Sequence, residues 1–178
     1  VGMISSDAPD TLRDFITGRV VPDVGSERNR QAVEKIFVGQ KGYSPGDVRV
    51  DVPIEVEVGG ETYRSRIDLM VYNAGRPVVA VRCVAGSLGS WEREILAAAR
   101  IFGEIPVDWA VVSDGVSALV FDTVSGVQIG EGLAAVPSRE EAAARAAEKS
   151  PGPLAPKRLE KEKILFRSYD SMRVNVIR

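Results

Sequence analysis

The stretch that decides the fold runs Thr62-Tyr63-Arg64-Ser65-Arg66-Ile67-Asp68-Leu69-Met70-Val71-Tyr72, then Asn73-Ala74-Gly75-Arg76-Pro77, then Val78-Val79-Ala80-Val81-Arg82-Cys83-Val84. In the first part, Arg64, Arg66 and Asp68 alternate with apolar residues, which predicts a strand with one polar face. The middle part has the Asn, Gly and Pro residues of a turn. The last part is apolar except for Arg82, which predicts a central strand buried on both sides.

A strand and a helix precede this stretch. Apolar and polar residues alternate over 50–58, which predicts a strand, and Pro53 places that strand at a sheet edge or a bulge. Gly59-Gly60 then predicts a tight hairpin turn. Upstream, Ser26 is a good N-cap for a helix that ends near Gly39.

A second helix and short strands follow the stretch. Ser90 is expected to cap a helix whose apolar residues recur at helical spacing from Trp91 onward. Short strands are expected at 109–112 and 118–121, with a further one at 127–129. The order α-β-β-β-α-β-β predicts an α/β fold, with a central mixed sheet of four to six strands flanked by helices.

Three segments are expected along the chain. Residues 1–25 form an irregular or partly helical lead-in, 26–137 form the domain, and 138–178 form a C-terminal helical arm. Ser138 and Glu141 make a capping box, and a Pro-rich linker follows the helix that they open. Beyond the linker, the apolar residues at helical spacing are Leu165, Tyr169, Met172 and Val176. They predict an amphipathic helix or a swapped arm.

Charge is distributed unevenly along the chain. Residues 157–178 carry seven Lys/Arg and three Asp/Glu, or +4, so the rest of a chain with net charge −2 carries −6. A body with this charge is a poor general binder of phosphates. We therefore expect any nucleic-acid contact to be local or to run through the tail.

The chain has a single cysteine, Cys83, and no histidine. These counts exclude an internal disulfide, a zinc site of the Cys/His kind and any nucleophilic pair that needs histidine. Catalysis would rest on carboxylates, Arg or Lys, hydroxyls or a hard metal ion held by oxygen. No apolar run approaches the roughly 20 residues that cross a bilayer, and no secretory signal pattern is present, so we expect a cytoplasmic protein without a membrane segment.

Further motifs occur along the chain in a defined order. They are Glu27-x-x-Arg30-Gln31, Lys41-Gly42-Tyr43, the strand 63–71 with Asp68, and the turn Val111-Val112-Ser113-Asp114-Gly115. Over roughly residues 26 to 125 this order resembles the N-terminal nuclease domain of type I restriction enzyme R subunits, members of the PD-(D/E)XK endonuclease superfamily. The resemblance implies a restriction-endonuclease-like core that acts on DNA with Mg²⁺. In that family a helix glutamate, a strand aspartate and Glu-x-Lys on the next strand surround the metal ions and the scissile phosphate.

Asp68 matches the strand aspartate, but the next strand departs from the family pattern. In one register Ala80 replaces the glutamate and Arg82 the lysine, and in the other Arg82 takes the place of the acid and Val84 that of the lysine. Residues two apart share a face of a strand, yet neither register supplies a carboxylate. We expect Asp68 and Arg82 to open onto a common pocket beside the first helix.

Other acids are candidates for the missing carboxylate. Glu92 and Glu94 begin the second helix and, with Asp68, are candidate metal ligands, while Glu27 or Glu34 could supply another oxygen. The alternative is that acids in a first helical turn only favour the helix N-terminus. Asp68 has a structural alternative too, as an ion pair with one of the neighbouring arginines.

Three hypotheses therefore remain open. The first is a degenerate nuclease-like domain retained for binding DNA, with Arg64 and Arg66 as candidate contacts, or for binding a partner protein. The second is a working Mg-dependent endonuclease with an atypical site that includes Asp68 and Arg82. The third is a homodimeric assembly module formed through the sheet edge or the C-terminal arm.

Overall fold

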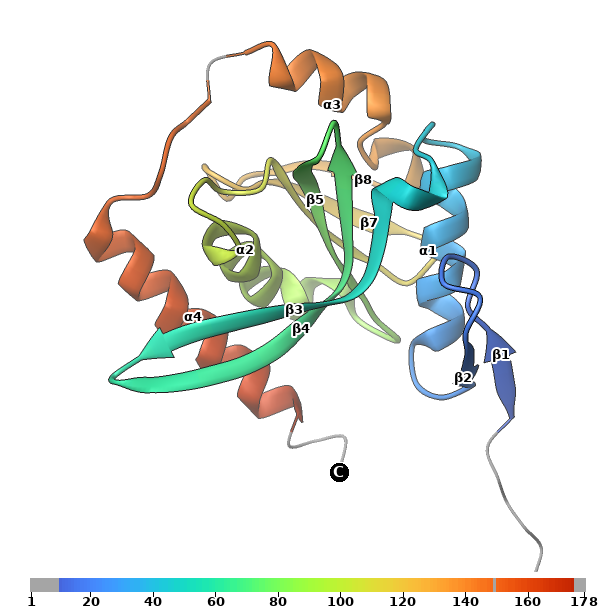
Figure 1. Cartoon of the computed structure of the whole chain (residues 1–178), viewed down its shortest axis with the longest axis horizontal. Helices are drawn as coiled ribbons and strands as arrows, with labels where there is room; N and C mark the ends of the chain where they lie inside the picture. The colour runs from blue at the N-terminus through green and yellow to red at the C-terminus, as the bar shows by residue number, and fades with distance from the viewer. Residues whose placement is uncertain (1–9, 149, 175–178) are drawn as a thin grey trace, which may run out of the picture.

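The computed structural model of the chain describes residues 10–148 and 150–174, and its centre is a six-stranded mixed sheet (Figure 1). The strands, in both chain and sheet order, are β3 (Val48–Val58), β4 (Glu61–Asn73), β5 (Arg76–Cys83), β6 (Trp109–Ser113), β7 (Ala118–Asp122) and β8 (Gln128–Glu131). β5 and β6 run parallel, and every other neighbouring pair runs antiparallel. The predicted α/β fold with a mixed sheet is confirmed.

Helices cover both faces of the sheet. On one face, α1 (Glu27–Gly39) and α3 (Arg139–Ala146) contribute Phe37 and Ala142 to the core. On the other face, α2 (Glu92–Ile101) and α4 (Pro156–Val174) contribute Ile95 and Phe166. α2 is the crossover between the parallel strands β5 and β6. Three short 3₁₀ helices complete the order, at Pro45–Asp47, Leu88–Trp91 and Leu133–Ala135.

The long β3–β4 hairpin bends where its strands pass from one core to the other. Val48 and Leu69 lie in the core on the α1 side, whereas Ile54 and Ile67 lie in the core on the α2 side. The bend falls at Asp51, whose φ of 52° is in the left-handed region that aspartate tolerates better than most residues. In Figure 1 the far half of the hairpin sweeps away from the sheet toward α4.

The N-terminal lead-in differs from the prediction of irregular or partly helical structure. Within its described part it forms a two-stranded antiparallel sheet of β1 (Thr11–Arg13) and β2 (Val20–Pro22). Asp14 organises the connection, because its carboxylate accepts hydrogen bonds from the backbone amides of Ile16 and Thr17. The signal was weak in sequence because each strand has only three residues.

The helix-start predictions had different outcomes. Ser138 accepts a bond of 3.1 Å from the Glu141 amide, and the Glu141 carboxylate accepts one of 2.7 Å in return, which confirms the capping box. Ser90 does not cap α2, however. The N-cap is Trp91, because the chain enters α2 through a 3₁₀ turn.

The predicted apolar stripe of α4 is only partly confirmed, because Leu165 packs against the core on the α2 side but the most buried positions have another phase. The residues of α4 that are buried are Glu162, Phe166 and Asp170, which recur every four positions. Met172, by contrast, is 57 % exposed, and Val176 lies outside the described residues. α4 packs against α2 of its own chain through this mixed stripe, in which acids flank one aromatic ring. No helix in the described part of the chain is both long and apolar enough to span a membrane.

Candidate functional site

Asp68 and Arg82 meet across the β4–β5 ladder. Leu69 pairs with Val81, so the residues next to them, Asp68 and Arg82, are also neighbours. Arg82 Nη1 donates to Asp68 Oδ1 over 2.9 Å, and the Cys83 amide donates to Asp68 Oδ2 over 2.7 Å. Both carboxylate oxygens of Asp68 are therefore engaged by the next strand.

Arg82 also contacts two carboxylates that lie on helices outside the sheet. Its Nη2 donates to Glu94 of α2 and lies 3.6 Å from the carboxylate of Asp170 of α4. Tyr63 of β4 donates its hydroxyl to Asp170 over 2.5 Å. We call Arg82, Asp68, Glu94, Asp170 and Tyr63 the Arg82 cluster. Apart from Asp68 and Tyr63, which keep some exposure, its members are buried, and the C-terminal helix covers it.

The Arg82 cluster holds a permanent positive charge in its centre. Burial opposes the charge on Arg82, but Asp68, Glu94 and Asp170 outweigh it, so the pKa of Arg82 is raised above its ordinary value. Burial, with the hydrogen bond to Asp170, also raises the pKa of Tyr63. Burial and the nearby Asp68 raise the pKa of Cys83 well above its ordinary value, so this thiol is protonated and not a nucleophile at neutral pH.

The cluster does not fit the Mg²⁺ site that the resemblance implies. A magnesium ion needs several oxygen ligands at one point, in nearly octahedral geometry. Here the guanidinium of Arg82 lies at the point where the carboxylates converge, and both oxygens of Asp68 already accept a hydrogen bond. Over residues 10–148 and 150–174 there is no group of three or more His, Cys, Asp or Glu side chains that could hold a metal ion.

Of the two acids of α2 that were candidate metal ligands, Glu94 is buried beside Arg82 and Glu92 is not. Glu94 is 1 % exposed and bonds Arg82, so it lies beside Asp68 through a shared partner. Glu92 is only half-buried at the first residue of α2, and none of the described contacts of Arg82 comes from it. The two register partners, Ala80 and Val84, are buried in the apolar core on the same side.

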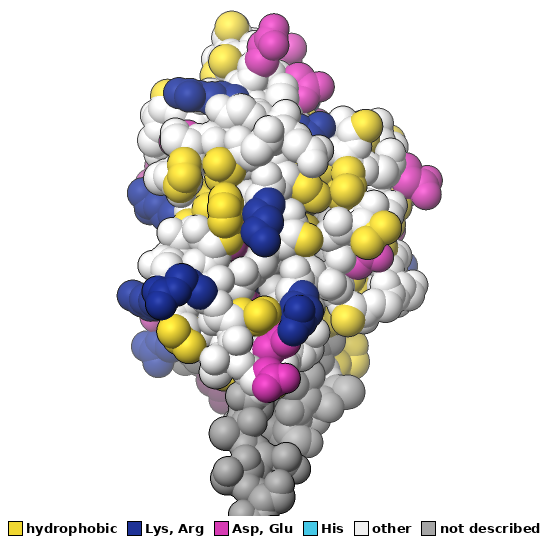
Figure 2. Space-filling view, turned by 90° about the vertical axis from the view of Figure 1, so that its right-hand side faces the viewer, with side chains coloured by type: hydrophobic (Ala, Val, Ile, Leu, Met, Phe, Trp, Pro, Cys, Tyr) yellow, Lys and Arg dark blue, Asp and Glu magenta, His cyan; other side chains and the backbone are white. Residues whose placement is uncertain are grey.

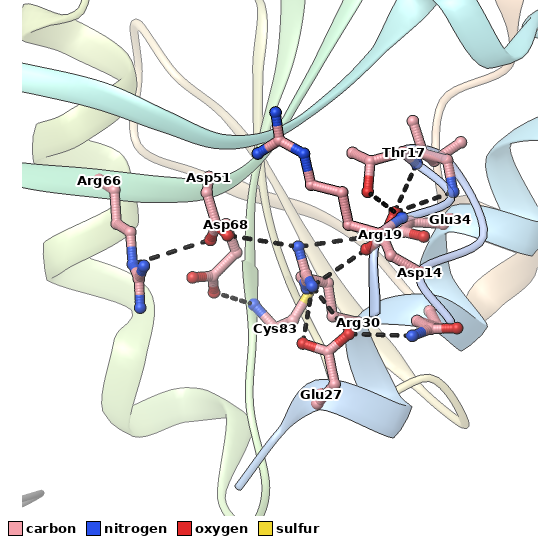
Figure 3. A network of polar contacts seen from close by, with 12 residues as sticks. Asp14, Thr17, Arg19, Glu27, Arg30, Glu34, Asp51, Arg66, Asp68 and Cys83 are labelled. Carbon is pink, nitrogen blue, oxygen red and sulfur yellow. Dashed lines mark hydrogen bonds and ion pairs between the residues drawn. The ribbon is translucent and has the colours of Figure 1, made fainter. Parts of the chain in front are cut away.

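Glu27 and Glu34 belong to a second network, which is centred on Arg30 of α1 (Figure 3). Arg30 Nη2 lies 2.6 Å from the Glu27 carboxylate and 3.1 Å from Asp14 of the N-terminal hairpin. Its Nη1 lies 3.7 Å from Asp51 and 3.9 Å from Glu34. These side chains form the Arg30 cluster. The expected common pocket beside the first helix is therefore not where Arg82 lies, since Arg82 faces α2 and α4.

Glu34 is the member of the Arg30 cluster whose carboxylate is buried without an ordinary hydrogen bond to a described residue. It is fully buried, and neither of its carboxylate oxygens has a hydrogen bond of ordinary geometry in the described structure. Burial raises the pKa of Glu34 to about 8, repulsion from Asp14 adds to the rise, and Arg30 offsets part of it. Glu34 is thus expected to be largely protonated at neutral pH.

Replacement of Glu34 by glutamine is expected to flatten the pH dependence of stability. The folded-state pKa of Glu34 is above its ordinary value of 4.5, so its contribution is fully present below that value and is lost as the pH rises through about 8. The loss is at most about 1.4 kcal/mol per pH unit. The chain has no histidine, so few other groups titrate in this window. Urea unfolding at a series of pH values measures the slope.

The matched control for that variant is Glu140→Gln, which changes an exposed acid of α3. This control should keep the wild-type slope. An equal slope in Glu34→Gln and wild type would show that Glu34 does not carry the titration.

Arg64 and Arg66, the candidate DNA contacts, lie on the outer part of the hairpin. Their side chains are 72 % and 69 % exposed. Arg64 pairs with Glu55 at 2.9 Å, and Arg66 lies 3.7 Å from Asp51. Each is accessible, but each already has an acidic neighbour on β3.

Sequence reasoning missed several residues of these clusters, among them Asp170 and Asp14. Asp170 gives no direct signal because it lies on a helix about one hundred residues beyond Asp68, outside any recognisable motif. Asp14 was not selected because its strands are too short to predict. The only available signal for Asp170 was the i, i+4, i+8 spacing of Glu162, Phe166 and Asp170, in which the acids look solvent-exposed.

Comparison with known protein families gives a match over more than half of the chain. Residues 25–137 match the family described as the N terminus of the type I restriction enzyme R protein. The matched segment contains α1, all six strands of the central sheet and α2, whereas α3 and α4 lie beyond it. No curated protein and no solved structure matches the chain.

Proposed function

Because this chain belongs to the family of type I restriction enzyme R protein N termini, we propose that it is a domain that binds DNA without cutting it. The observation that carries the proposal is the position of Arg82. Where the family resemblance implies carboxylates around Mg²⁺, the guanidinium of Arg82 bonds Asp68 and Glu94. An arginine stays charged at any physiological pH, so it neutralises these acids permanently.

Substrate access to the cluster is also restricted. Metal-assisted hydrolysis needs a cation with an open position for water, and a site to which the substrate has access. In this chain the C-terminal helix lies over Arg82, and Asp170 occupies the outer side of the guanidinium. These contacts support a structural role for Asp68, as an ion pair that holds β4, β5, α2 and α4 together.

The homodimer hypothesis has less support. The arm that was expected to reach a neighbouring copy packs on its own chain, through Phe166 and the ion pair of Glu162 with Arg100. The sheet edges at β3 and β8 remain a prediction for self-association.

A titration of the wild-type protein into fluorescent duplex DNA tests the binding half of the proposal. We expect measurable binding at low salt that weakens steadily as salt is added, because phosphate contacts release condensed counterions. The protein should bind duplexes of different sequence with similar affinity if its contacts are to phosphates. Absence of binding at low salt, or binding that is insensitive to salt, would contradict this half of the proposal.

A further inference from the structure

We propose that the outer face of α4 is the surface that contacts DNA phosphates, an inference that rests on the proposed function. α4 carries six Lys/Arg and three Asp/Glu along 156–174. Two of the three acids, Glu162 and Asp170, are turned inward and are 5 % and 4 % exposed. The helix therefore buries most of its negative charge, while Lys157, Arg158 and Lys161 are exposed to solvent.

The inward acids are neutralised by the body of the domain. Glu162 lies 2.9 Å from Arg100 of α2, and Asp170 lies in the Arg82 cluster. Burial of these pairs leaves Glu160 as the exposed acid of the helix, and Glu160 pairs locally with Lys163 at 2.9 Å. The acids of α4 therefore lie mostly on the side that packs against the domain, and its exposed cations lie on the outer side.

Lys157 and Lys161 are the two cations best placed for a ligand. Both are exposed, and neither forms an ion pair with a described residue. At a spacing of four they lie on one side of the helix, about 6 Å apart along its axis. The neighbouring Arg158 already has a hydrogen-bond partner, because it donates to the Val124 carbonyl over 2.8 Å.

On the opposite side of the molecule the cations are scattered (Figure 2). Figure 2 shows the face over α1 and the N-terminal hairpin, where Lys and Arg side chains are separated from one another by hydrophobic and uncharged ones. Several cations of the α1 side of the sheet have partners. Arg28 pairs with Asp23, and Lys41 donates to the Ala134 carbonyl.

Duplex DNA fits this surface better than a membrane does. An amphipathic helix binds a bilayer by inserting its apolar side. The apolar residues that face the body are occupied, because Phe166 is fully buried and Leu165 packs beside it. Only Ile164 and Met172 remain as exposed large apolar side chains in the described part of α4. Two exposed lysines on a helix that is held by its inner side instead suit neighbouring phosphates of a duplex.

The test compares three variants of the full chain in the same DNA titration. Lys157→Ala/Lys161→Ala is expected to weaken binding to every duplex. It should also make the plot of the logarithm of the binding constant against the logarithm of the salt concentration less steep, by about 2. Glu160→Gln removes the exposed acid of the face and should bind more tightly than wild type. Lys35→Ala/Arg139→Ala makes the same change in net charge on the other side of the sheet and should keep the wild-type slope.

The outcomes separate the two proposals. An unchanged slope in the α4 variant, or an equal drop in the α4 variant and its control, overturns the assignment of the surface while DNA binding stands. Failure of wild type to bind DNA overturns both, as does binding only to vesicles of anionic lipid. Circular dichroism melting checks the fold, and these exposed substitutions should leave it nearly unchanged.

Discussion

Replacement of Arg82 by alanine is expected to cost about 3–5 kcal/mol of folding free energy, the typical loss when one partner of a buried ion pair is removed. The variant would leave Asp68, Glu94 and Asp170 around an empty centre, with their charges no longer compensated. A small domain has about 5–15 kcal/mol in total, so a large share of its stability is at risk. Urea unfolding at neutral pH measures the loss.

The cause of that loss can be checked by pH. Carboxylates without a cation take up protons more readily, so the gap between Arg82→Ala and wild type should narrow as the pH falls. Arg64→Ala is the matched control, because Arg64 is exposed and its pair with Glu55 is worth only about 0–1 kcal/mol. If Arg82→Ala unfolds at the same urea concentration as wild type, the cluster is not what holds these elements together.

Replacement of Phe166 by alanine is expected to destabilise the protein by about 3–5 kcal/mol, the range for large-to-small changes of a buried aromatic residue. Phe166 is fully buried and packs at an angle of 69° to the ring of Tyr63, with 6.3 Å between ring centres. Its loss should loosen α4 first, because the remaining contacts of that helix are largely ion pairs and hydrogen bonds. Thermal melting, with amide hydrogen exchange of α4, measures both effects.

Met172→Ala is the control that separates the observed packing from the stripe predicted by apolar spacing. Met172 is 57 % exposed, so its truncation should change the melting temperature little. A larger loss for Met172→Ala than for Phe166→Ala would mean that α4 docks through the predicted face.

Local chemistry made the central sheet predictable. Gly59 and Gly60 both have positive φ, as the hairpin turn requires, and alternation on either side of them set the strands. The run that contains Arg82 is buried between β4 and β6, as its apolar composition indicates. The family resemblance found by motif agrees with the matched residues 25–137.

The arrangement of the acids could not be predicted in the same way. Whether Asp68 meets a metal ion or a guanidinium depends on Asp170 and Glu94, which reach it from two different helices. Buried acids on α4 follow no hydrophobic pattern, so apolar spacing identified Leu165 but not the buried positions Glu162, Phe166 and Asp170. The bend at Asp51 could not be predicted either, because strict alternation does not show that residues of one hairpin pack into two different cores.

Incubation of supercoiled plasmid with wild-type protein and Mn²⁺ or Mg²⁺ is the measurement that tests the central claim most directly. Asp68→Asn serves as the control, with its melting curve recorded alongside. The expected result is plasmid that stays supercoiled with both proteins, because a guanidinium holds the position of the metal. Nicking or linearisation by wild type that is lost in folded Asp68→Asn would contradict the account.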